Sequence, residues 1–371
     1  LIPAADGDRL SGVLMTDVRT GKLVFVQARA TLLATGGGPT MYRYHTPSGD
    51  KSCDGMAMAL RAGLPLRDME MVQFHPTGLL AGNDTRMTGT VLEEGLRGAG
   101  GHLLNGEGQR FMLQHDDRGE RATRDIVSRG IFHEIREGRG TPKGGVYISM
   151  SHLGPDNVRQ QFKGMVERCA DSGFDLAGGR VEVVPTAHYM MGGVVFKPDC
   201  TTEMTGLFAA GEDTGGVHGA NRLGGNGVAN STVFGGIAGD SMAAWLAEGH
   251  QSHAPDTQTL QAAAREALRP LENEPGSLLD IQQALHALMW DKAGILRTKE
   301  RLESAATELE ALDEQLSRTG LQDTGSLAFN LTWHDWLNLR NQILVSRTIV
   351  QAALSRENSR GAHYREDYPG T

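Results

Sequence analysis

The segment GLFAAGE at residues 206–212, with PTAHYMMGG at 185–193 before it and HGANRLGGN at 218–226 after it, decides the fold. Residues 205–211 have the composition of a buried strand that ends in glycine, and a helix of small residues is expected near 227–247. Histidine, arginine, asparagine and glycine are dense in the two flanking segments and follow no helical or strand period. They fit neither a core nor a solvated face, so they predict a ligand-binding cleft beside an α/β layer.

A similar strand, turn and helix occurs near the start of the chain. Residues 23–35 are rich in β-branched and aliphatic side chains, predict strands, and run into three glycines at 36–38. Residues 54–62 then predict a helix that stops at Gly63. Glycines after a strand let the backbone approach a dinucleotide, although three glycines can equally form a plain turn.

The rest of the chain differs in character from these layers. Residues 74–185 combine short elements, polar loops and an amphipathic helix near 124–137, which predicts an inserted domain. From about residue 257 the composition shifts to Ala, Leu, Glu, Gln and Arg, and helical periodicity predicts an antiparallel bundle. The expected helices of this bundle lie near 257–269, 278–291, 294–318 and 333–356.

Composition and charge exclude several classes of protein. The net charge of −9 argues against nucleic-acid binding, which requires clustered Lys and Arg. The cysteines Cys53, Cys169 and Cys200 form no CxxC pair, so neither an iron–sulfur cluster nor a structural zinc site is expected in this chain. Their sparse, odd number fits a reducing compartment. No apolar run approaches the ~20 residues of a membrane span.

Four charged or titratable side chains stand out between residues 75 and 124. Pro76 restricts His75 to an extended backbone, which predicts an imidazole presented at a loop. Glu94 and Arg97 are three residues apart and can pair if their turn is helical. Arg124 lies at an expected helix start, where a cation is mildly unfavourable. In isolation, these residues could equally be a satisfied histidine and surface ion pairs.

Taken together with the first segments, these residues suit a small dianion. Arg222 can form a bidentate pair with a carboxylate, and His75 and His188 can hydrogen-bond carboxylate oxygens. Arg124 supplies a second arginine. The sequence therefore predicts that the ligand of the cleft is a small dicarboxylate.

Eight motifs, in order and covering nearly the whole chain, resemble the flavoprotein subunits of succinate dehydrogenase and fumarate reductase. They are ATGGG (34–38), DMEMVQFHPTG (68–78), EGLRGAGG (94–101), RDIVSRGI (124–131), PTAHYMMGG (185–193), GLFAAGE (206–212), HGANRLGGN (218–226) and SRGAHYREDYP (359–369).

The resemblance implies a fold of α/β plus α class. A split FAD-binding domain would comprise residues 1–73 and 186–246. An inserted α+β capping domain would comprise 74–185, and an antiparallel helical bundle 247–363. Residues 364–371 would begin a truncated carboxyl-terminal segment.

The resemblance also implies roles for individual residues, and no metal site. The substrate would be bound by His75, Thr77, His188 and Arg222. Proton transfer would use Arg124, recharged by Glu94 and Arg97. The residues expected around FAD are Thr35, Gly36, Gly37, Asp54, Glu212 and Asn226.

The activity implied is the interconversion of succinate and fumarate. Hydride would pass between flavin N5 and one substrate carbon while Arg124 exchanges a proton with the neighbouring carbon. Electrons would pass to or from an iron–sulfur subunit, which would in turn connect to a membrane anchor. This places the protein in the cytoplasm, peripheral on the inner face of the plasma membrane, without a membrane span of its own.

Alternatives and departures remain open at this point. L-aspartate oxidase is a related enzyme with a similar cleft, and the chain could also be a truncated, non-catalytic fragment. Glu93 stands where the family usually has threonine, and Gly227-Val228-Ala229 replaces Ser-Leu-Leu. The family's glycine-rich ADP-binding segment is expected upstream of Leu1, so this chain alone is not expected to hold FAD stably.

Overall fold

The computed structural model describes residues 1–82 and 85–370, which divide into two compact units. The first unit contains Leu1–Arg43, Ser48–Val72 and the chain from Tyr189 onward. The second contains Tyr44–Pro47 and Gln73–His188. The second unit is therefore inserted between two parts of the first.

The first unit begins with a small antiparallel sheet. It consists of β1 (Ile2–Ala4), β2 (Gly7–Asp17) and β3 (Lys22–Gln27), in that order. The residues predicted as strands, 23–35, are divided between β3 and a separate strand, β4 (Thr31–Leu33). The prediction of strand is confirmed, and the break at residues 28–30 divides it between two different sheets.

Strand β4 pairs in parallel with β11 (Leu207–Ala209), the strand predicted around GLFAAGE. Both strands therefore end at the same edge, where the Ala210 N–H donates to the Leu33 carbonyl at 3.0 Å. A second pair joins β5 (Leu66–Arg67) and β10 (Gly193–Val194). These short pairs join segments that are 176 residues apart (207 − 31) and about 130 residues apart in sequence.

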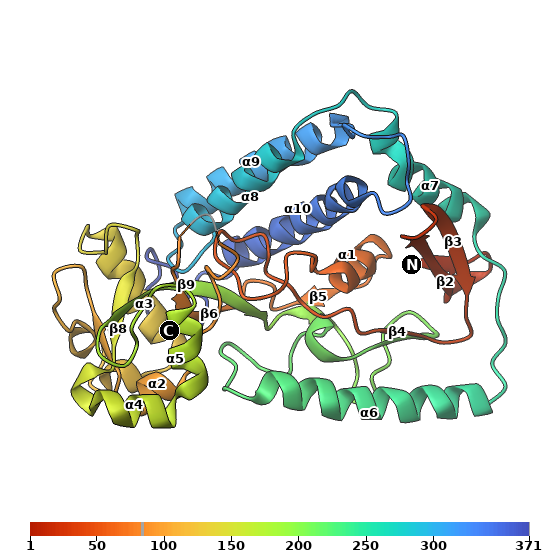
Figure 1. The fold of residues 1–371 in the computed structure, drawn as a ribbon. Coiled ribbons are helices and arrows are strands. Elements are labelled where there is room, and N and C mark those ends of the chain that lie inside the picture. Colours follow the sequence, from red (N-terminus) through yellow and green to blue (C-terminus); the bar gives the residue numbers. More distant parts are fainter. Residues whose placement is uncertain (83–84, 371) are drawn as a thin grey trace. The chain divides into compact units, whose positions relative to one another are not determined.

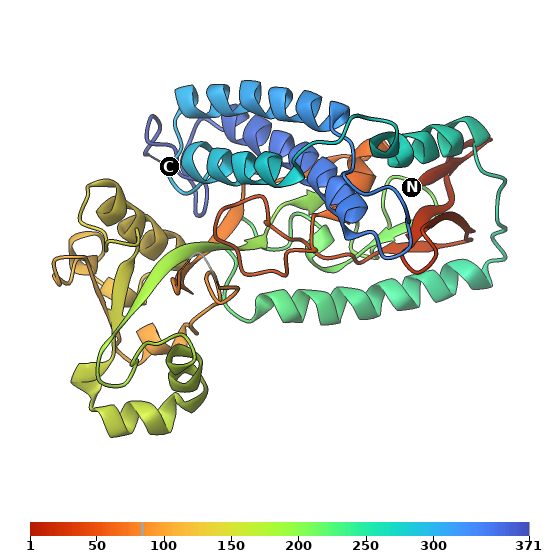
Figure 2. The same ribbon diagram turned by 45° about the horizontal axis from the view of Figure 1, so that its top comes forward.

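Two predicted helices follow the strand ends. α1 (Asp54–Arg61) ends close to Gly63 as expected, and η4 (Gly211–Asp213) is a short 3-10 helix directly after β11. α6 (Asn226–Ala247) begins after Gly225, whose φ of 80° is accessible to glycine. The helix lies along one side of the first unit, away from the long helices within residues 278–355, in both views (Figures 1 and 2).

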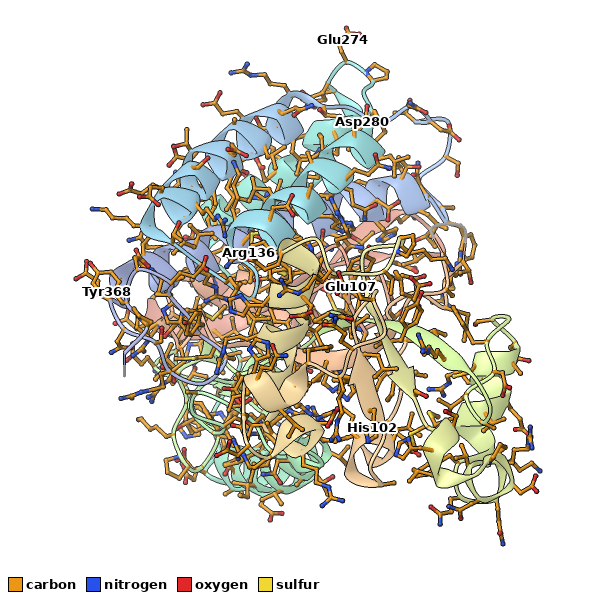
Figure 3. The ribbon with its side chains drawn as sticks, turned by 90° about the vertical axis from the view of Figure 1, so that its left-hand side faces the viewer. His102, Glu107, Arg136, Glu274, Asp280 and Tyr368 are labelled. Atoms are coloured by element: carbon orange, nitrogen blue, oxygen red, sulfur yellow. The ribbon has the colours of Figure 1, made fainter. Side chains whose placement is uncertain are left out.

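The carboxyl-terminal part of the first unit is helical. It contains α7 (Thr257–Leu268), the 3-10 helix η5 (Arg269–Leu271), α8 (Leu278–Lys292), α9 (Lys299–Arg318) and α10 (Leu331–Ser355). α8, α9 and α10 lie side by side as a bundle (Figures 1 and 2). Helix starts are capped by side chains, for example at α8, near Asp280 in Figure 3.

The start of α9 differs from the prediction, which placed it at residue 294. The hydroxyl of Thr298 accepts a hydrogen bond from the Arg301 N–H and caps the helix. Arg297, just before the cap, instead pairs through its backbone with the carboxyl-terminal segment at Arg365. The apolar period continues through residues 294–298, but this backbone pairing and the cap keep them out of the helix.

The second unit is built on a four-stranded sheet. Its order is β6 (Val72–Leu79), β9 (Arg180–Met190), β8 (Val146–Ser149) and β7 (His102–Leu104). The prediction that Pro76 places His75 in a loop is wrong, because both residues lie inside β6. β6 is an edge strand, where a residue without an N–H is tolerated.

Helices surround this sheet, including the amphipathic helix predicted near residues 124–137. Figure 3 marks two points of the unit, His102 on β7 and Arg136 at the end of that helix. The helices are α2 (Gly95–Gly98), η1 (Met112–Gln114), η2 (Gly119–Arg121), α3 (Arg124–Arg136), η3 (Ser151–Leu153), α4 (Pro155–Gln161) and α5 (Lys163–Ala170).

Two features of the described residues concern membranes and metals. In residues 1–82 and 85–370, no helix combines the length and the apolar character that crossing a membrane requires. Within the same residues, no three His, Cys, Asp or Glu side chains are grouped so that they could hold a metal ion.

Candidate active-site residues

Glu94 joins two arginines in the second unit. Its Oε2 accepts a hydrogen bond from Arg124 Nη2 at 2.9 Å, and its Oε1 accepts one from Arg97 Nη2 at 3.1 Å. Arg124 also donates from Nη1 to Gln73 Oε1 at 3.1 Å, and Arg97 from Nη1 to the Glu120 carbonyl at 2.6 Å. The predicted pairing of Glu94 with Arg97 across one turn is confirmed, because α2 forms there.

The three side chains of this hydrogen-bonded series are buried to different degrees. The side chains of Glu94, Arg124 and Arg97 are 45%, 10% and 2% exposed. Burial lowers the pKa of the Arg97 guanidinium, and the charge of Arg124 adds to this effect while that of Glu94 opposes it. Burial alone would raise the pKa of Glu94, but hydrogen bonds and charge from Arg124 and Arg97 lower it overall. Glu94 is therefore a carboxylate bridging two guanidiniums, one of which is almost fully buried.

His75 and His188 come from neighbouring strands of the sheet, β6 and β9. Their rings are 5.6 Å apart at an angle of 64°. His75 Nδ1 accepts a hydrogen bond from the Thr77 N–H at 3.3 Å, so in the neutral ring Nε2 carries the proton. His188 Nδ1 lies 2.8 Å from the hydroxyl of Thr46. The fully buried Thr77 donates its hydroxyl proton to the Leu92 carbonyl, which leaves its oxygen as an acceptor.

Arg222, in the first unit, lies over an aromatic ring. Its Cζ is 4.4 Å from the centre of the Tyr189 ring, and its side chain is nearly buried. The Arg222 N–H donates to the sulfur of Met191 at 3.0 Å, and Nη1 donates to the Leu223 carbonyl at 3.2 Å. Backbone and ring together fix the direction of this guanidinium.

Tyr189 is itself held by two polar neighbours. Its hydroxyl is 3.1 Å from His218 Nε2 and accepts from Asn230 Nδ2 at 3.3 Å. Burial, with the charge of Arg222 adding to it, lowers the pKa of His218 to about 4. The neutral Nε2 can therefore accept the Tyr189 hydroxyl proton near neutral pH.

The carboxylate of Asp213 holds the glycine turn after β4. Its Oδ1 accepts a hydrogen bond from the Thr35 hydroxyl at 2.9 Å, and Oδ2 accepts from the Thr35 N–H and, at 3.2 Å, from the Gly36 N–H. The Gly55 N–H, on α1, donates to the Thr35 hydroxyl at 2.8 Å. Because β4 and β11 are parallel, η4 after β11 brings Asp213 to the end of β4.

Glu212 packs against the next glycine of the same turn. A Cβ on Gly37 would lie 2.2 Å from Glu212 Oε1, and that oxygen accepts the Met190 N–H at 2.9 Å. Burial raises the pKa of Glu212 to about 7 and that of Asp213 to about 6. The two adjacent acids thus favour their uncharged forms more than ordinary carboxyl groups do.

The two other residues expected near FAD lie at helix starts. Asp54 begins α1 and accepts hydrogen bonds from Ser52 at 2.6 Å and from Asn341 of α10. Asn226 begins α6 and is exposed. Asp54 therefore ties α1 to the helical bundle, while Asn226 remains accessible.

The residues present fit a flavin nucleotide. The turn after β4, at Gly36-Gly37-Gly38, carries no side chain of its own, and the Glu212 side chain fills the space beside Gly37. At the start of α6, exposed Leu223 and Val228 lie beside backbone N–H groups of a helix amino terminus. Apolar side chains next to such donors suit a flat ring with one apolar and one polar edge, or the phosphates attached to it.

The predicted residues therefore fall into separate groups. The second unit brings together Arg124, Glu94 and Arg97, and pairs the rings of His75 and His188. Arg222 and the residues expected around FAD belong to the first unit.

The sequence did not lead us to three residues that contact the candidate site residues. Each of them could have been found from its position in the sequence. Gln73 is two residues before His75 on the same strand, so both side chains lie on one face. Tyr189 adjoins His188. Asp213 follows directly after a strand that pairs in parallel with β4, where side chains at the ends of the two strands meet.

Comparison with known proteins defines the class. Residues 2–228 match the family model described as FAD binding domain, and residues 282–371 match the one described as fumarate reductase flavoprotein C-term. These matches define the class, the FAD-dependent oxidoreductases. The chain belongs to the family of the flavoprotein subunits of fumarate reductase and succinate dehydrogenase.

Individual relatives are similar over almost the whole chain. One subunit of the fumarate reductase (CoM/CoB) of Methanothermobacter marburgensis is 41% identical over 99% of this chain and 66% of that protein. L-aspartate oxidase 1 of Ralstonia nicotianae is 36% identical over 98% of this chain and 65% of that protein. This chain thus spans slightly less than two thirds of both relatives.

A solved structure confirms the expected fold class. The structure of Escherichia coli quinol fumarate reductase is 34% identical and matches with a TM-score of 0.90, over 99% of this chain and 65% of that chain. The α/β layers, the inserted sheet and the helical bundle are those expected from the motifs.

Proposed function

We propose that the protein to which this chain belongs interconverts succinate and fumarate. The observation that carries the proposal is the continuous contact from Arg124 through Glu94 to Arg97. A carboxylate that bridges a partly exposed and a buried guanidinium can pass a proton between them. Addition of a proton to a carbon atom beside a carboxylate requires such a group at the substrate.

Bound FAD would supply the hydride acceptor or donor for this reaction. Arg124 would exchange a proton with the neighbouring substrate carbon, and Glu94 would return the proton to Arg124. Arginine rarely loses its proton. Here a second guanidinium lies on the same carboxylate, and this nearby positive charge would make transient loss easier.

Substrate binding is assigned to the histidines and to Arg222. The Nε2 proton of His75 can be donated to one carboxylate oxygen, and His188 can bind a neighbouring oxygen. Arg222 would bind a carboxylate in a bidentate manner. Thr77 would act on the substrate through His75, because its hydroxyl proton is donated to the Leu92 carbonyl while its N–H donates to His75 Nδ1.

Electron transfer and location follow from the family. Electrons would pass to or from an iron–sulfur subunit, which would connect the protein to a membrane anchor on the inner face of the plasma membrane. The naming of similar proteins as subunits supports an assembly of this kind.

Aspartate is the second candidate substrate. Glu93 supports it, because an exposed carboxylate next to Glu94 would attract an ammonium group and repel a plain dicarboxylate. If the protein interconverts succinate and fumarate, the holoenzyme should reduce a dye with succinate as the electron donor. Release of hydrogen peroxide with aspartate, and no dye reduction with succinate, would instead establish an aspartate oxidase.

The proton-transfer assignment is tested with Arg124→Ala and Glu94→Gln in the holoenzyme. Loss of a positioned acid–base group should lower turnover at least about 100-fold while fumarate binding stays measurable. Arg136→Ala, an exposed arginine on the same helix, is the matched control. Retention of about a tenth or more of wild-type turnover by Arg124→Ala would exclude its role as proton donor.

A further inference from the structure

A turn near the carboxyl end of the chain contacts the loop that carries Arg222. The Ala362 N–H donates to the Ala220 carbonyl at 2.8 Å. Gly361 has a φ of 53°, and a Cβ there would lie 2.4 Å from the same carbonyl oxygen. The side chains of Ala220 and Ala362 pack against one apolar cluster that also contains Tyr189. The turn is thus fitted closely to the backbone two residues before Arg222.

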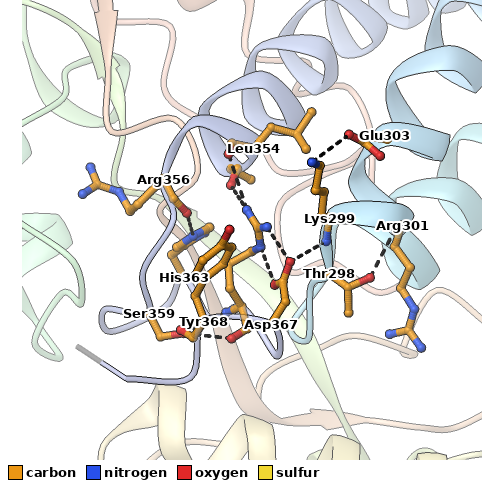
Figure 4. A network of polar contacts seen from close by, with 12 residues as sticks. Thr298, Lys299, Arg301, Glu303, Leu354, Arg356, Ser359, His363, Asp367 and Tyr368 are labelled. Carbon is orange, nitrogen blue, oxygen red and sulfur yellow. Dashed lines mark hydrogen bonds and ion pairs between the residues drawn. The ribbon is translucent and has the colours of Figure 1, made fainter.

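Several side chains make the turn rigid. Arg365 binds Asp367 through two hydrogen bonds of 2.8 and 2.6 Å, and Asp367 also accepts the Lys299 N–H at the start of α9, at 2.9 Å. The Ser359 hydroxyl donates to the Tyr368 carbonyl at 2.7 Å and accepts the Arg365 N–H at 2.9 Å. Figure 4 shows these contacts as one connected network.

His363 completes the network. It is completely buried, accepts from Arg297 Nη1 at 2.8 Å and lies 3.2 Å from the Arg356 carbonyl through Nε2. Arginine can only donate, so His363 Nδ1 is the acceptor and Nε2 carries the proton. The turn is therefore anchored by an uncharged ring with both nitrogens occupied.

We propose that the segment Ser359–Tyr368 is a positioning element for Arg222. The turn holds the loop at Ala220, and the Tyr189 ring holds the guanidinium itself, so the two supports together set where Arg222 meets a carboxylate. This inference rests on the proposed role of Arg222 in substrate binding. Neither Gly361 nor Ala362 would touch the substrate.

The test is Gly361→Ala in the holoenzyme. Malonate is the probe, because it has two carboxylates but no carbon–carbon bond that can be desaturated, and its affinity is measured by calorimetry. The new Cβ must displace the Ala220 carbonyl, and malonate should bind about tenfold more weakly because bidentate pairing depends on geometry. Gly370→Ala, with nothing within 4 Å of its added Cβ, should bind as the wild type does.

The same substitution is repeated in an Arg222→Lys background. If the turn acts through Arg222, Gly361→Ala should weaken malonate binding by less than about twofold in the Arg222→Lys background. The reason is that the effects of coupled sites are not additive. Equal weakening in both backgrounds, or none in the wild type, would overturn the positioning role. Unchanged malonate affinity in Arg222→Lys alone would instead remove the assignment of Arg222 to the substrate, which is a separate failure.

Ser359→Ala provides a milder variant, in case Gly361→Ala does not fold. It removes the hydroxyl contacts with Arg365 and Tyr368 but adds no atom near Ala220. Malonate should bind about threefold more weakly, again only when Arg222 is present. Wild-type affinity in a folded Ser359→Ala protein would contradict the inference.

Discussion

Glu94 is the residue on which most of the proposed chemistry depends, and its neighbour Glu93 places a second, exposed acidic side chain beside it. The Oε1 atom of Glu93 lies 3.7 Å from where a Cβ on Gly95 would be, so its carboxylate lies over the first turn of α2. In this position it keeps its charge at the surface, close in sequence to a group that binds two arginines. This charge would repel the proposed dianionic substrate.

Glu93→Thr should therefore strengthen dicarboxylate binding. Removal of one exposed negative charge is expected to lower the KM for fumarate about twofold to threefold at low ionic strength. The effect should shrink as salt is added, because exposed charges are screened. Steady-state kinetics at two salt concentrations measure it.

Glu107→Gln is the control for this prediction. Glu107 is another exposed glutamate of the second unit (Figure 3). An equal decrease in KM for the control would show that net charge, not position, is responsible. A rise in KM for Glu93→Thr would indicate that Glu93 binds substrate.

At the residue scale, local spacing was predictable and long-range contacts were not. Glu94 and Arg97 pair because residues three apart lie on the same face of a helix, and this spacing can be read from the sequence alone. Asp213 reaches Thr35 only because β4 and β11 pair although they are far apart in the sequence. The Tyr189 ring under Arg222 likewise depends on how two distant segments pack.

Among the elements, α1 lies very close to the glycine turn that we propose binds the cofactor. A Cβ on Gly55 would lie 2.3 Å from Asp213 Oδ1 and 2.8 Å from the Thr35 hydroxyl. This absence of a side chain lets Asp213 bind the N–H groups of Thr35 and Gly36. The glycine is thus required by packing between two elements.

Gly55→Ala should weaken FAD binding. Displacement of Asp213 removes hydrogen bonds to a charged group, which corresponds to at least about a tenfold loss of affinity. The measurement is the ratio of flavin absorbance to protein after dialysis. Gly164→Ala, a helical glycine with open space around it, should retain its flavin, and full retention by Gly55→Ala would disprove the packing argument.

The positions of helices and strands were largely predictable, but their ends were not. α9 begins five residues later than the apolar period indicates, because Thr298 caps it and Arg297 pairs with the carboxyl-terminal segment. His75 lies in a strand because an edge position accepts the following proline. Both outcomes depend on partners that are remote in sequence.

For the whole molecule, buried acids and histidines give opposite contributions to stability as pH changes. The pKa values of Glu212 and Asp213 are raised by burial to about 7 and about 6, so their uncharged forms favour the folded state. Their contribution is complete below the unfolded-state values and is lost as pH rises through about 6 to 7. The pKa values of His218 and His363 are lowered by burial to about 4 and about 3, so their contribution is lost as pH falls below about 6.5.

The two opposite contributions largely offset each other between about pH 8 and 5, because the acids of the folded state and the histidines of the unfolded state take up protons over the same range. The unfolding temperature of the wild type should therefore change little there. Glu212→Gln removes one acid contribution, so its unfolding temperature should instead fall steadily as the pH is lowered from about 7.5 to 5. Differential scanning calorimetry across the range measures both profiles. Glu203→Gln, at an exposed glutamate of the same unit, should keep the wild-type profile. A wild-type profile in Glu212→Gln would contradict the raised pKa of Glu212.

The pairing of β4 with β11 has a consequence for synthesis of the protein. β4 ends at Leu33 and β11 begins at Leu207, so residues 34–206, including the whole second unit, emerge from the ribosome between them. At roughly 5–20 residues per second, the first strand waits about 9 to 35 seconds for its partner. The inserted unit can fold during this delay. The glycine turn after β4 cannot be fixed by Asp213 until this delay ends, so the edge that we propose binds the flavin is completed late in translation.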